Sequence, residues 1–179
     1  MKRLATILSI FFFSILTAST ANAQADGAFI CISASSKAAL MKGYGITIHI
    51  TNTETGEKFV SQSLGPISRY AVIEKVPAGE YAVTFAEIPI GKGAWRNWSP
   101  ELQDLFGTFE VEAGQAYYLG TYEATFEGKL DDRRFILSFK DNVVPQKLIK
   151  QLSKRHLPSE GFKSIKPWKK TMIFAEASF

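Results

Sequence analysis

The chain has 179 residues, a formal net charge of +4 and one cysteine. This length suits a single domain with its own hydrophobic core and is hardly sufficient for two. One cysteine, Cys31, excludes an intramolecular disulfide, so the core must stabilise the fold by itself.

Residues 1–23 have the pattern of a secretory signal peptide. Lys2 and Arg3 form a basic start, the run from Leu4 to Leu16 is largely apolar, and Ala21-Asn22-Ala23 fits a cleavage site. This run is shorter than the roughly 20 residues that span a bilayer, and no later stretch approaches that length. We therefore expect an exported protein, periplasmic or secreted after cleavage near Ala23, with no transmembrane helix. Its net charge falls to +2 without Lys2 and Arg3, which gives no argument for nucleic-acid binding.

The pattern of residues 24–142 predicts short strands separated by turn signals about every ten residues. The apolar run Ala28–Ile32 favours an interior strand, and three isoleucines alternate with polar residues in Tyr44–Thr51. Further strands are predicted at Lys58–Gln62, Arg69–Glu74, Tyr81–Ile88, Thr108–Val111, Tyr117–Phe126 and Arg133–Phe139. Such spacing is typical of a β-sandwich or a β-barrel.

One long loop interrupts this rhythm between Pro89 and Leu105. Ser99 and Pro100 can start a short helical turn at its end. The loop also carries the best candidate binding residues, Trp95, Arg96, Asn97 and Trp98. Two indoles, a guanidinium and an amide can stack on and hydrogen-bond to a sugar, a peptide or a protein surface. The same tryptophans can instead fold back and fill the end of a sandwich.

Two glycine-centred turns frame that loop. Pro77-Ala78-Gly79-Glu80-Tyr81 is followed by Phe109-x-Val111-x-Ala113-Gly114-x-x-Tyr117-Tyr118-Leu119-Gly120. This layout resembles the hairpins of prealbumin-like and carboxypeptidase-regulatory-like sandwiches, and a group of bacterial envelope domains of unknown function. The resemblance covers about residues 46–139. It implies an antiparallel β-sandwich of seven to eight strands that acts as a binding or structural module, with no catalytic residues to transfer.

Residues 143–179 are predicted to add a C-terminal helix and a basic arm that pack on the same domain. Asn142 can cap a helix over Val144–Arg155 whose apolar side would cover the sheet. Trp168–Phe174 can add an edge strand. The basic residues of this end are Lys147, Lys150, Lys154, Arg155, Lys163, Lys166, Lys169 and Lys170, against the single acid Glu160. They form either a surface for an anionic lipid, lipopolysaccharide or an acidic partner, or an ordinary solvated face.

No arrangement of residues points to catalysis, a metal or a cofactor. His49 and His156 are the only histidines, and neither has the spacing of a metal site or a catalytic triad. His49 is predicted to lie on the wet face of its strand. Bulky residues precede Cys31, which argues against lipidation there and favours a small buried hydrophobe.

The sequence therefore predicts an exported, non-catalytic binding or structural module of the bacterial cell envelope. Its partner would be an unidentified protein, glycan or anionic lipid. Two alternatives remain open. A small outer-membrane β-barrel is suggested by the alternation Ile173, Ala175, Ala177, Phe179 at the C-terminal end. An envelope hydrolase without a recognisable motif is the other.

Overall fold

The computed structural model describes residues 27–36, 46–64, 68–90, 93–97, 101–127, 134–153, 155, 157 and 161–175. The predicted signal peptide lies outside these ranges. In chain order, the strands are β1 (Ala28–Ser36), β2 (Thr47–Asn52), β3 (Lys58–Val60), β4 (Gln62–Ser63), β5 (Tyr70–Val76), β6 (Gly79–Ile90), β7 (Gly93–Asn97), β8 (Thr108–Val111), β9 (Ala116–Glu127), β10 (Arg134–Asp141), β11 (Phe162–Ser164) and β12 (Thr171–Ala175). The helices are α1 (Glu101–Phe106) and α2 (Gln146–Leu152). The protein is mainly β, as predicted.

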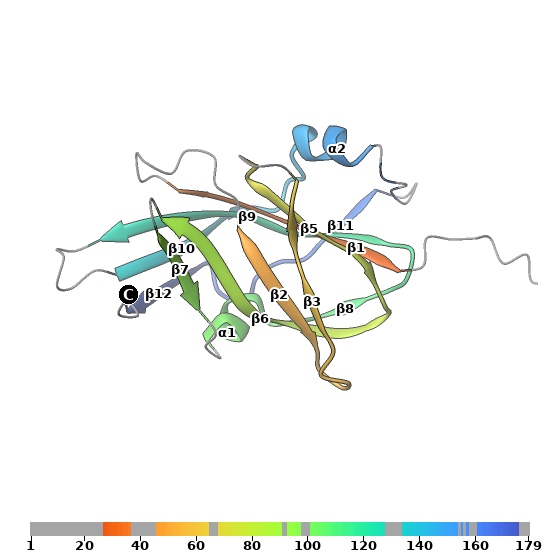
Figure 1. Ribbon diagram of the computed structural model, residues 1–179, viewed down its shortest axis with the longest axis horizontal. Helices are drawn as coiled ribbons and strands as arrows, with labels where there is room; N and C mark the ends of the chain where they lie inside the picture. Colours follow the sequence, from red (N-terminus) through yellow and green to blue (C-terminus); the bar gives the residue numbers. More distant parts are fainter. Residues whose placement is uncertain are drawn as a thin grey trace, which may run out of the picture.

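The strands form two sheets (Figure 1). The seven-stranded sheet has the order β12-β10-β9-β1-β5-β4, and β11 also pairs with β9. The five-stranded sheet has the order β3-β2-β6-β7, and β8 also pairs with β6. The strands β6 and β9, each of 12 residues, therefore pair along one edge with two shorter strands in succession: β8 and β7 on β6, and β11 and β10 on β9.

The prediction of an entirely antiparallel arrangement with seven or eight strands was wrong. The strand β1 pairs antiparallel with β5 but parallel with β9, and β11 is also parallel to β9. No hairpin turn joins β1 to β9, because Phe29 aligns with Ala116 far along the chain, so nothing local forces opposite directions. The number of strands is larger because short strands share the edges of β6 and β9.

The predicted strand Lys58–Gln62 is divided between the two sheets at Ser61. The strand β3 pairs with β2 in one sheet, and β4 pairs with β5 in the other. At the crossing point, Ser61 N donates to the Ile48 carbonyl at 2.9 Å, and Ser61 Oγ accepts from Ile48 N at 2.8 Å. A single buried serine therefore satisfies both backbone groups of Ile48 where the chain leaves the first sheet.

One hydrophobic core takes side chains from both sheets. Ile46, Ile48 and Ile50 are all buried in it, as the alternation of that strand predicts. They pack in the same cluster as Ile30 and Leu137 of the seven-stranded sheet. The facing sides of the two sheets thus provide most of the apolar burial that stabilises the domain.

The predicted long loop between Pro89 and Leu105 is mostly regular structure, and that prediction was wrong. Gly93–Asn97 forms β7, which pairs antiparallel with β6 from Ile90↔Gly93 to Ala86↔Asn97. The sequence is misleading here because Gly91 and Gly93 suggest a loop, whereas the pairing of β7 with β6 continues up to Gly93. The predicted helical turn after Pro100 is confirmed as α1.

The helix α1 fills one end of the core. Its apolar side chains Leu102, Leu105 and Phe106 are all buried in the main cluster. The Phe106 ring lies 5.1 Å from the ring of Tyr122, measured between centroids. The helix therefore adds its apolar side to the core that the two sheets share.

A tyrosine reaches back to the backbone beside each glycine-centred turn. The Tyr81 hydroxyl donates to the Pro77 carbonyl at 3.0 Å, and the Tyr117 hydroxyl accepts from Glu112 N at 2.9 Å. The first contact has the form of a tyrosine corner, in which a strand-start tyrosine fixes the preceding turn. The second turn and the end of β5 both meet Gly27, since Gly114 N donates to the Gly27 carbonyl at 3.2 Å and a Cβ atom on Gly27 would lie 2.5 Å from the Lys75 carbonyl carbon.

The helix α2 covers part of the outer face of the seven-stranded sheet (Figure 1). Leu148 and Leu152 are fully buried there, in a second cluster that contains Phe29, Cys31 and Tyr118. The predicted apolar side of the helix is confirmed, and each buried leucine contributes about 1.5–3 kcal/mol. The helix is shorter than the predicted Val144–Arg155, and Pro145 rather than Asn142 occupies its N-cap position. The predicted C-terminal edge strand is confirmed as β12.

The two helices have six and seven residues. Within the described ranges, neither has the length and apolar character that a bilayer-spanning helix requires.

Candidate functional site

The predicted binding residues Trp95, Arg96 and Asn97 lie in β7, at an edge of the five-stranded sheet. Their backbone pairs with β6, with Trp95 opposite Ile88 and Arg96 opposite Glu87. The side chains of these three residues, and all of Trp98, lie outside the part of the chain that the structure describes. The binding role of these four residues remains a prediction.

The predicted basic residues are distributed over several parts of the molecule. Arg155 pairs with Glu74 of β5, and Lys163 Nζ lies 2.8 Å from a Glu112 carboxylate oxygen. Lys169 Nζ lies 3.3 Å from a carboxylate oxygen of Asp104 in α1. Each of these three cations joins the C-terminal region to a different element. Lys154 lies outside the described residues, as does His156.

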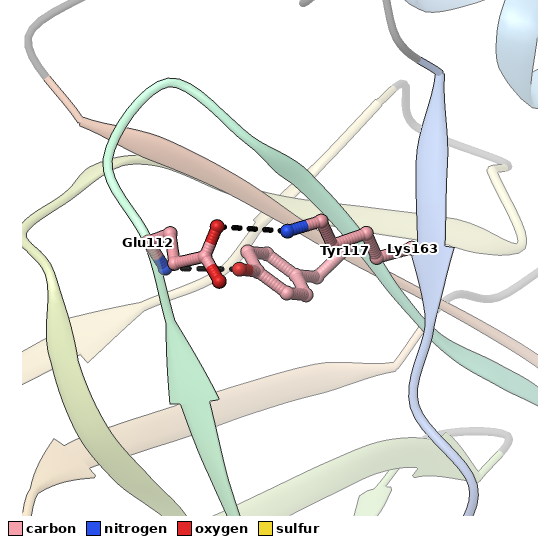
Figure 2. A network of polar contacts seen from close by, with 3 residues as sticks. All are labelled: Glu112, Tyr117 and Lys163. Carbon is pink, nitrogen blue, oxygen red and sulfur yellow. Dashed lines mark hydrogen bonds and ion pairs between the residues drawn. The ribbon is translucent and has the colours of Figure 1, made fainter.

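Figure 2 shows the contact that Lys163 makes at the second glycine-centred turn. Its ammonium donates to the Glu112 carboxylate and lies 5.9 Å from the centroid of the Tyr117 ring. The same tyrosine accepts the Glu112 backbone N–H, and β11 places Lys163 beside Tyr117 in register. The ion pair is exposed, so it contributes at most about 1 kcal/mol. The contact holds β11 of the C-terminal arm beside the second glycine-centred turn.

The remaining cations of the region are exposed lysines. Lys147 and Lys150 project from α2, and Lys166 and Lys170 lie between β11 and β12. Among the residues with described positions, none of these four has a carboxylate within ion-pair distance. Their charges are therefore available to a partner, which distinguishes them from Arg155, Lys163 and Lys169.

Trp168 is a candidate that the sequence analysis did not single out. Its side chain is 68% exposed, yet several contacts hold it in place. Trp168 N donates to the Leu105 carbonyl at 3.0 Å, and Lys169 N approaches the same oxygen at 3.3 Å. This carbonyl is in the last turn of α1, where helix carbonyls have no partner within the helix. The signal in the sequence was a tryptophan within a run of lysines, Lys166-Pro167-Trp168-Lys169-Lys170.

The indole of Trp168 lies directly against Gly107, which follows α1. Gly107 has a φ of +70°, and a Cβ atom there would lie 2.1 Å from two atoms of the indole. Gly107 N also donates to the Gln103 carbonyl at 2.6 Å and so ends the helix. Only glycine gives both the left-handed backbone and the close approach. We call Lys166, Trp168, Lys169 and Lys170 the Trp168 platform.

His49 is half-buried on the outward side of β2. Its ring centroid lies 4.3 Å from that of Phe85 on the neighbouring strand. Burial lowers the pKa of His49, and the Lys58 charge lowers it further. Both effects favour the neutral form of the imidazole. No group of three potential metal ligands occurs among the described side chains.

Cys31 and two tyrosines are titratable groups held away from water. Burial raises the pKa of the Cys31 thiol, and the Glu74 charge raises it further. Burial raises the pKa of Tyr118 to about 12. The hydrogen bond between the Tyr118 hydroxyl and Thr121 Oγ1, at 2.8 Å, acts in the opposite direction and lowers this pKa. Burial also raises the pKa of Tyr122. None of these groups is prepared to act as an anionic nucleophile near neutral pH.

Alkaline pH is expected to destabilise the fold through Cys31. The ordinary pKa of the thiol is 9.0, and the folded value lies far above it. As the pH rises from 9 to 10, the unfolded chain loses the thiol proton while the folded chain retains it. The free energy of unfolding therefore falls by about 1 kcal/mol over that unit. Denaturant unfolding at pH 8, 9 and 10 measures this fall.

The matched control is Cys31→Ala, which has no thiol to ionise. Its free energy of unfolding should change less between pH 9 and 10 than that of the parent chain, because only the tyrosines then contribute. Equal losses in the two proteins would contradict the assignment to Cys31.

No protein-family model and no curated protein matches the chain. A solved structure with some similarity is a leucine-rich repeat protein from Bacteroides thetaiotaomicron. It matches with a TM-score of 0.33 and 11% sequence identity, over 59% of this chain and 14% of that protein. The chain thus spans 14% of the length of that protein.

Proposed function

We propose that the protein is an exported, non-catalytic binding module of the bacterial cell envelope, and that its partner is anionic. The observation that carries the proposal is the division of the C-terminal cations into two sets. Arg155, Lys163 and Lys169 neutralise acids of the domain itself. Lys147, Lys150, Lys166 and Lys170 are exposed, without a carboxylate partner in the described ranges. Exposed positive charges that no described acid of the domain neutralises attract anions.

We also propose that the two sheets are a β-sandwich of the immunoglobulin or prealbumin-like type. The shared core and the tyrosine corner at Tyr81 support this assignment. A division of one strand between the sheets, as at Ser61, is common where sheets meet at a corner. A rigid scaffold of this kind carries its binding residues on edges, loops and appended segments.

Export to the periplasm or beyond is the third part of the proposal. It rests on the basic start, apolar run and cleavage pattern of residues 1–23. Cleavage there would leave all of the described strands, from β1 onward, in the mature chain.

Co-sedimentation of the purified chain with envelope components tests the binding proposal. Separate arms would contain peptidoglycan sacculi, lipopolysaccharide and anionic phospholipid vesicles. We expect binding to at least one arm at about 50 mM NaCl and its loss at about 500 mM, because salt screens exposed charges. A protein that binds none of the three at low salt, and captures no protein from solubilised envelopes, would overturn the proposal.

Two variants then locate the surface. Trp95→Ala/Trp98→Ala tests β7 and the residue after it, and Lys147→Glu/Lys150→Glu tests α2. Reduced binding in either variant would assign the contact to that element. Binding that is unchanged in both would remove these two surfaces as the contact.

A further inference from the structure

Trp168 combines an exposed side chain with a backbone and a ring that neighbouring residues hold in place. The Trp168 side chain is 68% exposed, while its backbone N–H is bonded to Leu105 and its ring is pressed against Gly107. The next residue adds the Lys169–Asp104 contact to the same helix. An aromatic group fixed before binding loses little conformational entropy when a partner meets it.

The charges around this indole favour an anionic partner. Residues 161–175 contain Lys163, Lys166, Lys169 and Lys170 and no acidic residue. Asp104 contacts the platform, but its carboxylate is already paired with Lys169. Lys166 and Lys170 lie two residues before and two residues after Trp168 in the chain, and both are exposed. Indole with neighbouring ammonium groups is the combination that proteins place at the headgroup level of membranes.

The shape of the platform favours an extended surface over a small recessed ligand. Binding pockets enclose most of a ligand, whereas a side chain that is 68% exposed protrudes from its surroundings. Lysine ammonium groups are point charges on flexible stems, which suit a layer of many phosphates better than one oriented group. A lipid headgroup layer meets both conditions.

We propose that the Trp168 platform docks the protein on an anionic phospholipid surface, with the indole at the headgroup level and Lys166 and Lys170 on the phosphates. This inference deepens the proposed function and rests on it, because it names the partner and the contact. One indole and a few lysines give weak, reversible association. We therefore expect peripheral docking that salt reverses.

Sedimentation with vesicles of phosphatidylglycerol, with phosphatidylcholine vesicles as the neutral comparison, tests the inference. The parent chain should bind the anionic vesicles at low salt and leave the neutral ones in solution. Lys166→Glu/Lys170→Glu should weaken the partition coefficient roughly tenfold or more, since each lysine near an anionic surface contributes substantially. Trp168→Ala should weaken it as well and abolish any blue shift of fluorescence that the parent chain shows on vesicle addition.

Matched controls separate the platform from general positive charge. Lys147→Glu/Lys150→Glu makes the same charge change on α2, which lies on the opposite side of the molecule from α1 (Figure 1). Val143→Ala removes another highly exposed apolar side chain, one that is not part of the platform. We expect Val143→Ala to bind as the parent does, and the α2 variant to lose clearly less affinity than the platform variant with the same charge change. Equal losses in the α2 variant and the platform variant would overturn the inference.

Other outcomes distinguish this inference from the broader proposal. Binding to sacculi or lipopolysaccharide without binding to phosphatidylglycerol would overturn the lipid inference and leave the binding module standing. Vesicle binding that is insensitive to Trp168→Ala would overturn the role of the platform alone. Circular dichroism of each variant establishes that it is folded before its binding is compared.

Discussion

Replacing Gly27 with alanine is expected to lower the free energy of unfolding by about 3 kcal/mol or more. Gly27 has a φ of +146°, and a Cβ atom there would lie 2.5 Å from the Lys75 carbonyl carbon and 2.8 Å from Val76 N. These are backbone atoms of β5, which cannot rotate away, so β1 and β5 must separate locally. Overpacking costs about 1–3 kcal/mol, and a strained backbone adds to that. Denaturant unfolding measures the loss.

Gly56→Ala is the matched control for Gly27→Ala. Gly56 also has a positive φ, +72°, but a Cβ atom there would have no neighbour within 4 Å. The control therefore isolates backbone strain, for which we expect about 1 kcal/mol. If the two alanine variants lost equal stability, close packing of Gly27 against β5 would not be the cause.

Replacing Gly107 with alanine is expected to displace Trp168 and to cost about 2 kcal/mol. The new Cβ atom would overlap the indole at 2.1 Å, and the φ of +70° is unfavourable for alanine. Because the Trp168 and Lys169 amides both bond to Leu105, a shift of the ring also strains the contact of the arm with α1. Denaturant unfolding gives the stability change, and tryptophan fluorescence reports the displaced ring.

Gly161→Ala and a double variant test that explanation. Gly161 has a φ of +81° with no neighbour within 4 Å of a Cβ atom, so its alanine variant carries strain without overlap. In a Trp168→Ala background the overlap is absent, and Gly107→Ala should then cost only what Gly161→Ala costs. A cost for Gly107→Ala that is independent of Trp168 would contradict the close contact.

These two glycines have different consequences for function. Gly27 joins the start of β1 to β5 and to the second glycine-centred turn, so its replacement should destabilise the two-sheet scaffold. Gly107 lies under the Trp168 platform, so its replacement should weaken vesicle binding while most of the domain remains folded. A folded Gly107→Ala variant with intact vesicle binding would indicate that the position of the indole is unimportant.

Local patterns predicted individual elements well. The alternating isoleucines of β2, the helical turn after Pro100, the apolar side of α2 and the edge strand β12 all follow from periodicity or turn chemistry. Each depends on residues close together in the chain, where side-chain direction and φ preferences act directly. Pairing between distant segments has no such local signal, which is why the parallel contacts of β1 and β11 with β9 were not predicted.

The candidate site shows the same division. The sequence identified a basic C-terminal end, but it could not separate Lys163 and Lys169, which meet acids of the domain, from Lys166 and Lys170, which do not. The acids concerned, Glu112 and Asp104, lie more than fifty residues earlier in the chain. Trp168 was likewise indistinguishable from a core residue, because its exposure depends on how the arm crosses Gly107.

Residues close together in the chain were sufficient to predict the β-rich class, the glycine-centred turns beside Pro77 and Gly114, and the amphipathic character of α2, since turn geometry and apolar periodicity depend on neighbouring residues. The folded arrangement was needed to show that Gly27 meets both Gly114 and β5, that Ser61 carries the chain from one sheet to the other, and that Trp168 stands exposed on Gly107. Those contacts join segments far apart in the chain, and their energy arises only when the two sheets have packed and excluded water from between them.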